Sequence, residues 1–123
     1  MLGSILLVDD DEQFRVMLSE ALTGEGFLVR EASDGLQGIR NYAEQPTDLV
    51  ITDLVMPEKE GLEMIVKLKL LNSEVKIIAM SGGGRDSSQN YLKMAKAFGA
   101  QLVIAKPFSH REILEVIRQV LEQ

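Results

Sequence analysis

Polar side chains that could do chemistry stand directly after four short apolar runs of this sequence. Asp9 and Asp10 follow ILLV, Asp53 follows LVIT, Ser81 follows IIAM and Lys106 follows LVIA. Taken singly, each is most simply interpreted as a solvated loop residue, because polar residues are common in loops. Together, carboxylates, a hydroxyl and an ammonium could bind a cation or a charged group. Whether they meet depends on the elements that carry them.

The three aspartates would repel one another strongly if they shared one site. Each pair of carboxylates within several ångström costs about 4 kcal/mol at an effective dielectric near 20. Three pairs cost on the order of 10 kcal/mol, which is comparable to the whole stability of a small domain. Such a cluster must protonate, stay apart or hold a cation. Oxygen ligands without nearby His or Cys favour a hard ion such as Mg²⁺.

Composition limits the class of protein. The 123 residues, 46% hydrophobic and 26% charged, predict one globular domain over residues 1–123 with a proper core. A net charge of −6 argues against nucleic-acid binding, since phosphate contacts need a basic face. Without cysteine there are no disulfides, thiolate nucleophiles or zinc–thiolate sites. The N-terminus MLGSILLVDD is neither a signal peptide nor a membrane span, so we expect a cytoplasmic protein without a membrane partner.

Five apolar runs alternate strictly with segments of helical period, which predicts an α/β fold with a doubly wound parallel sheet. Continuous apolar runs suit central strands that are buried on both faces. The second run carries charge in FLVREA and suits an edge position. The predicted strands are Ile5–Val8, Leu28–Arg30, Leu49–Thr52, Ile77–Met80 and Leu102–Ala105.

The segments between the runs predict five helices from apolar spacing at i, i+3 and i+4. Pro46 ends the second, Gly99 ends the fourth, and Ser109 with Glu112 forms a capping box that opens the fifth. Asp11 and Glu12 are expected at the start of the first helix, His110 exposed in the first turn of the last, and Met80 and Met94 in the core. The predicted buried faces are Phe14, Met17, Leu18, Ala21 and Leu22; Leu36, Ile39 and Ala43; Leu62, Ile65 and Val66; Tyr91, Met94, Ala95 and Phe98; and Ile113, Val116, Ile117, Val120 and Leu121.

In doubly wound sheets, ligands bind beyond the carboxyl ends of the strands. Four of the five predicted strands deliver a reactive polar group to that edge. The motifs there are VDD at 8–10, TDLVMP at 52–57, MSG at 80–82 and KPF at 106–108. In this order and spacing, over essentially the whole chain, they resemble the response regulator receiver domain, the CheY-like family. The resemblance implies five parallel strands in the order 2-1-3-4-5, flanked by five helices.

The same resemblance implies a magnesium site and an acceptor. Asp10, Asp53 and the backbone carbonyl of Val55 would ligate Mg²⁺, with Asp9 acting mainly through water. Asp53 would be the nucleophile that takes a phosphoryl group from a phosphohistidine and becomes an aspartyl phosphate.

Lys106 and Ser81 would contact the phosphoryl oxygens, and Pro107 resembles the family proline that follows a cis peptide bond. Val103 stands where many receivers have an aromatic residue, so we expect the signal to pass mainly through the loop 81–88. Val55 and Gly83 cannot orient an attacking water through their side chains, which predicts slow self-dephosphorylation.

In function, the resemblance implies a phosphoacceptor switch of a two-component or phosphorelay system, in the form of a stand-alone receiver. It would catalyse only its own phosphorylation and dephosphorylation, and would not be an enzyme with an outside substrate. Its partners would be a sensor histidine kinase or phosphotransfer protein and a downstream effector protein. The surface around Lys93, Lys96 and Arg118 is the expected docking face for a partner. Formation of a weak homodimer through the same face is the alternative.

Three alternative functions compete with the phosphoacceptor switch. The strongest is a receiver-like interaction module that works without phosphorylation. A flavodoxin-type carrier is disfavoured because acids after the first strand repel a phosphate. A haloacid-dehalogenase-type phosphatase needs an acid two residues after its nucleophile, where this chain has Val55.

Overall fold

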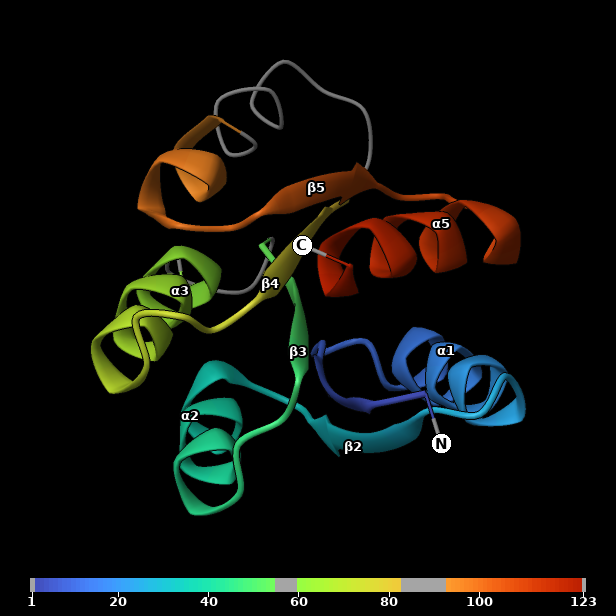
Figure 1. The fold of residues 1–123 in the computed structure, drawn as a ribbon, viewed down its shortest axis with the longest axis horizontal. Helices are drawn as coiled ribbons and strands as arrows, with labels where there is room; N and C mark the ends of the chain where they lie inside the picture. The colour runs from blue at the N-terminus through green and yellow to red at the C-terminus, as the bar shows by residue number, and fades with distance from the viewer. Residues whose placement is uncertain (1, 55–59, 83–92, 123) are drawn as a thin grey trace.

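The computed structural model describes residues 2–54, 60–82 and 93–122. Their regular elements alternate between strand and helix along the chain (Figure 1). Residues 93–98 are helical as well. The elements are β1 (Ser4–Val8), α1 (Glu12–Gly24), β2 (Leu28–Ala32), α2 (Gly35–Glu44), β3 (Leu49–Asp53), α3 (Glu60–Leu71), β4 (Ile77–Ser81), β5 (Leu102–Ala105) and α5 (His110–Leu121).

The strands form one parallel sheet in the order β2-β1-β3-β4-β5, which confirms the predicted topology and the edge position of β2. The strand ends differ from prediction. β2 continues through Glu31 and Ala32, because its ladder with β1 runs on until Val8 pairs with Ala32. Backbone pairing on an edge strand tolerates a charged side chain that can reach water. Asp53 and Ser81 are the last residues of their strands and do not lie in the loops beyond them.

Helices cover both faces of the sheet, so two separate cores form. In Figure 1, α1 and α5 lie on one side of the sheet and α2 and α3 on the other. Alternate residues of β1, β3 and β4 point to opposite cores, which explains their continuous apolar sequence. The core under α1 and α5 contains Ile5, Leu7, Leu18, Leu22, Phe27, Leu49, Ile51, Ile78, Met80, Ile104, Ile113, Ile117 and Val120. The core under α2 and α3 contains Leu6, Val8, Tyr42, Val50, Leu54, Leu62, Met64, Ile65, Leu68, Val75 and Ile77.

The predicted buried face of α2 is wrong for Leu36 and Ala43, whereas Ile39 is partly buried and packs against the core under α2 and α3. Leu36 is 59% exposed, while Gly35, Gly38 and Tyr42 are buried. The reason is close packing of α2: a Cβ on Gly38 would come within 2.7 Å of Met64 Cε and 3.1 Å of Val8 Cγ2. Apolar spacing alone assigns leucine, and not glycine, to the buried face of a helix. It therefore does not predict the close contact of Gly38 with Met64 and Val8.

Glycine also allows α3 to start close to the end of β3. A Cβ on Gly61 would lie 2.6 Å from the Asp53 carbonyl oxygen and 2.8 Å from Leu54 Cα. The end of the strand that carries Asp53 is therefore packed directly against the first turn of α3.

Several side chains predicted to be buried lie at the surface. Met17, Val66, Met94 and Phe98 are among the exposed large apolar residues, and Ala43 is exposed too. Each falls at the rim of its helix face, where a stripe predicted from spacing is wider than the contact that the sheet provides. Met80 is fully buried, as predicted. Tyr91 lies outside the described residues.

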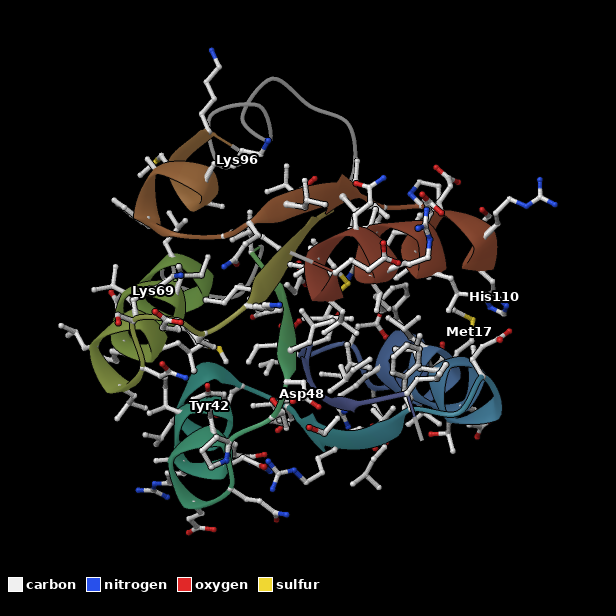
Figure 2. All side chains as sticks on the ribbon, in the orientation of Figure 1. Met17, Tyr42, Asp48, Lys69, Lys96 and His110 are labelled. Atoms are coloured by element: carbon white, nitrogen blue, oxygen red, sulfur yellow. The ribbon has the colours of Figure 1, made fainter. Side chains whose placement is uncertain are left out.

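The predicted helix ends are confirmed where the structure describes them. Ser109 and Glu112 form the capping box of α5, and His110 is an exposed residue in its first turn, visible at the periphery in Figure 2. Asp11 caps α1, followed by Glu12 in its first turn. Gly99 has a φ of 127° and its N–H bonds back to the carbonyls of Ala95 and Lys96, which ends that helix.

Candidate functional site

Strand register brings the predicted site residues to one edge of the sheet. Val8 pairs with Thr52, so Asp9 lies beside Asp53 one residue further on. Ser81 pairs with Ala105, and the Lys106 N–H donates to the Ser81 carbonyl at 2.8 Å. Side chains from four strand ends thus gather at the carboxyl edge, as the alternation of elements predicts.

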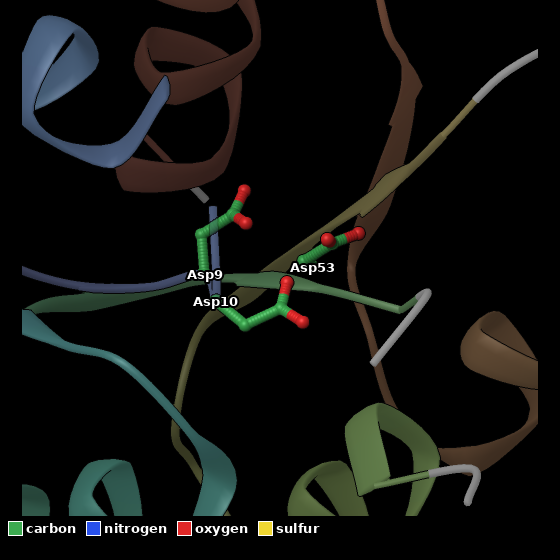
Figure 3. Close-up of side chains that lie close together, drawn as sticks. All are labelled: Asp9, Asp10 and Asp53. Atoms are coloured by element: carbon green, nitrogen blue, oxygen red, sulfur yellow. The ribbon is translucent and has the colours of Figure 1, made fainter. Parts of the chain in front are cut away.

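The three aspartates form a single cluster (Figure 3). Each offers a carboxylate oxygen, and these oxygens all lie within 4.8 Å of one another. Asp9 is fully buried and Asp53 is 5% exposed, whereas Asp10 is exposed. The crowding expected from the sequence is confirmed, and two of the three negative charges are largely removed from water.

Lys106 lies within the carboxylate cluster. Its Nζ is 2.7 Å from Asp9 Oδ2 and 3.5 Å from Asp53 Oδ2. Asp9 Oδ1 accepts a hydrogen bond of 2.9 Å from the backbone N–H of Asp11. Both oxygens of the buried Asp9 carboxylate are therefore satisfied, which is the condition for keeping a charge inside a protein.

The donor set fits a small hard cation. Three carboxylates face one ammonium here, so negative charge remains in excess within this cluster. Oxygens bound to one Mg²⁺ lie about 4 Å apart or less, given Mg–O distances of about 2.1 Å. The observed spacing within 4.8 Å needs only small side-chain movements to reach that. The Lys106 ammonium lies closer to Asp9 than to Asp53. We therefore expect Asp10 and Asp53, and not Asp9, to bind an ion directly. Val55 lies outside the described residues.

The remaining predicted residues lie at the same edge. Ser81 is the last residue of β4 and is 1% exposed. The Lys106–Pro107 peptide bond is cis, as the resemblance implied. Val103 is part-buried and packs against the core under α2 and α3. Gly83 and most of the loop 81–88 lie outside the described residues.

Two residues of α1 belong to this site and were not predicted there. The Phe14 ring centroid lies 4.1 Å from Lys106 Nζ, at the distance of a cation–π contact. Arg15 donates from Nη1 to the Asp9 carbonyl at 2.8 Å and pairs through Nε with Glu31 at 2.9 Å. Spacing placed Phe14 only in the core. Its position one helical turn after Asp10 is the signal that could have linked it to the site.

Comparisons with known proteins agree with this geometry. The sequence matches the family described as the response regulator receiver domain over residues 5–118. It is similar to the chemotaxis protein CheY of Bacillus subtilis (strain 168), with 35% identity over 122 residues that cover 98% of this chain and 99% of that protein. It is also similar to sporulation initiation phosphotransferase F of the same organism, with 30% identity over 95% of this chain and 92% of that protein.

Among solved structures, the receiver domain of NtrX from Brucella abortus superposes with a TM-score of 0.89 at 26% identity. That match covers 97% of this chain and 98% of the NtrX domain.

The chain belongs to the response regulator receiver domain family. As a member it is a signalling domain of two-component systems, a switch of the phosphoacceptor type. No helix within residues 2–54, 60–82 and 93–122 is long and apolar enough to cross a membrane.

Proposed function

We propose that Asp53 is the phosphoacceptor of this receiver and that the domain spanning residues 1–123 catalyses only its own phosphorylation and dephosphorylation. The observation that carries the proposal is the contact of one part-buried lysine, Lys106, with two carboxylates, of which Asp53 is the one at the end of the central strand β3. Asp53 has the position of a nucleophile because its carboxylate lies beside a cation and at the open edge of the sheet.

The proposed transfer uses these positions. A carboxylate oxygen of Asp53 attacks the phosphorus of a phosphohistidine, a P–O bond forms, and the P–N electron pair leaves with the imidazole nitrogen. Little covalent work falls to the protein, so catalysis consists of positioning and charge stabilisation. The Lys106 ammonium, 3.5 Å from Asp53 Oδ2, is close enough to donate to a phosphoryl oxygen attached there. Ser81, at the end of the neighbouring strand, supplies a hydroxyl donor.

Asp10 and Asp53 would hold Mg²⁺ directly, together with the backbone carbonyl of Val55, and Asp9 would act through water. A bound divalent ion supplies positive charge that offsets the repulsion between the carboxylates and the incoming phosphoryl group. Arg15 fixes the Asp9 carbonyl and thereby the loop that carries Asp9 and Asp10.

The domain would work in the cytoplasm. Its partners would be a sensor histidine kinase or phosphotransfer protein as donor and a downstream effector protein that takes up the signal. The surface around Lys93, Lys96 and Arg118 would dock the effector, since all three side chains are exposed. Figure 2 shows Lys96 extending away from the ribbon. A net charge of −6 is consistent with a protein partner and disfavours nucleic acid.

The decisive experiment is incubation with Mg²⁺ and acetyl phosphate, followed by intact-mass spectrometry. We expect one added phosphoryl group in the wild type, none without Mg²⁺, and none in Asp53→Asn. Asp48→Asn is the matched control, because Asp48 directly precedes the same strand at its opposite end. If the wild type took up no phosphoryl group and bound no beryllofluoride, the domain would instead be an interaction module that works without phosphorylation.

A further inference from the structure

We propose that Phe14 is a positioning residue for Lys106, and that its aromatic face holds the ammonium where phosphoryl transfer needs it. This inference rests on the proposed function, because it concerns the same lysine. Phe14 is not among the charged and hydroxyl groups at the strand ends. It comes from the first turn of α1, which lies next to the acidic loop in the chain.

Three contacts define the position of the Lys106 ammonium within the described residues. Asp9 Oδ2 lies at 2.7 Å, Asp53 Oδ2 at 3.5 Å and the centroid of the Phe14 ring at 4.1 Å. The side chain is 18% exposed, so water screens these contacts only in part. A cation over an aromatic face is attracted by the ring quadrupole, and the attraction strengthens when both groups are desolvated.

The ring itself is fixed by a second aromatic residue. Phe14 and Phe108 meet edge to face, with centroids 5.8 Å apart and planes at 85°. Both pack against the core under α1 and α5, and Phe108 follows Lys106 by two residues. The aromatic pair therefore ties the first turn of α1 to the segment that carries the lysine.

A ring suits this task better than another acid would. An ammonium has three N–H donors, and a hydrogen bond to a carboxylate fixes the direction of one of them. Contact with a π face places no such demand, so a donor can pass from Asp9 to a new oxygen on Asp53 without leaving the ring. Ammonium and acceptor are already close, so the step needs only a small movement of the lysine. Phe14 would therefore favour the phosphorylated state as well as the resting one.

The test removes the π face while keeping an apolar side chain. Phe14→Leu should lower the rate constant for phosphorylation by acetyl phosphate, and the affinity for beryllofluoride, by about three- to tenfold. Phe14→Tyr keeps the ring and should stay within about twofold of wild type. Trifluorophenylalanine at this position keeps the shape, weakens the quadrupole and should behave like leucine.

Phe27→Leu is the matched control. Phe27 belongs to the same core as Phe14 but precedes β2, at the edge of the sheet opposite the site. Both leucine variants lose buried aromatic area, so both should lose stability, while only Phe14→Leu should slow phosphorylation. Equal rates in the two variants, or faster phosphorylation in Phe14→Leu, would overturn the inference and leave the proposed function standing.

A second measurement decides the inference even if the domain takes up no phosphoryl group. The ring current of Phe14 should shift the methylene protons next to the Lys106 ammonium in the NMR spectrum. In Phe14→Leu this shift should disappear and the order parameter of the ammonium should fall, whereas Phe27→Leu should change neither. An unchanged ammonium order parameter in Phe14→Leu would show that the ring does not position the lysine.

Discussion

Two groups of ion pairs in this molecule differ mainly in their access to water. Lys106 pairs with Asp9 at the sheet edge, where the two side chains are 18% and 0% exposed. Arg118 pairs with Glu115 on α5 and with the C-cap residue Glu122, and the three side chains are 57%, 48% and 63% exposed. The number of opposite charges is similar, yet only the first group should matter for stability and for phosphoryl transfer.

The difference follows from what each charge would do without its partner. Asp9 has no access to water, so removal of Lys106 leaves a buried carboxylate without its counter-ion. Glu115 and Glu122 would simply be solvated, because exposed ion pairs gain little over water. The contribution of each ion pair to stability therefore depends on its burial and not on the distance between the charged atoms.

The largest effect is expected at Lys106. In Lys106→Met without divalent ions, the free energy of unfolding at neutral pH should fall by about 3 kcal/mol, in the range found when one partner of a buried pair is removed. Urea denaturation in EDTA measures this, with Lys96→Met as the exposed control. Excess Mg²⁺ should recover part of the loss, since a cation would again face the carboxylates. A variant as stable as wild type in EDTA would mean that Asp9 does not need the ammonium.

Removal of an acid should change the free energy of unfolding in the opposite direction. Asp10 is exposed and shares the cluster with two other carboxylates, so Asp10→Asn relieves repulsion and should raise the free energy of unfolding by about 1 kcal/mol in EDTA. The same variant should lose the stabilisation that Mg²⁺ gives the wild type, about 2.7 kcal/mol at a hundredfold excess over the dissociation constant. Paired urea titrations with and without Mg²⁺ test both signs, and a variant that still gained stability from Mg²⁺ would exclude Asp10 as a ligand.

The smallest effect is expected on α5. The pKa of Glu115 lies below its ordinary value of 4.5, chiefly because Arg118 donates a hydrogen bond to it and secondarily because Gln119 does. A lowered carboxyl pKa contributes stability that is fully present above the ordinary value and is lost as the pH falls through the folded value. Arg118→Ala should therefore raise the pKa of Glu115 in an NMR titration. The stability lost with it should be too small to move the urea midpoint at neutral pH, because water screens this exposed pair. A clear loss of stability at neutral pH would contradict the ranking by burial.

Much of the fold could be predicted from the sequence because its signals are local or repeat regularly. Continuous apolar runs and strict alternation predicted the sheet, and Ser109 with Glu112 predicted the start of α5. The buried face of α2 could not be predicted in this way. Its position depends on the contact between Gly38 and Met64, which lie far apart in the sequence and meet only in the folded chain.

The candidate site divides in the same way. Residues that end strands could be predicted, since topology alone brings Asp9, Asp53 and Lys106 to one edge. The pairing of Lys106 with Asp9, and the place of Phe14 beside the ammonium, depend on side-chain directions that strand order does not determine. Spacing assigns an aromatic residue on a helix face to the core, and Phe14 does pack there as well.

Gly61 limits what can change near Asp53. The atoms that a Cβ there would meet, at 2.6 and 2.8 Å, belong to the main chain of Asp53 and Leu54, which cannot rotate aside as a side chain can. During evolution, residue 61 can be substituted only if α3 shifts away from the end of β3 at the same time. For protein engineers, a Gly61→Ala substitution would displace the main chain of Asp53 while leaving the Asp53 carboxylate itself unchanged.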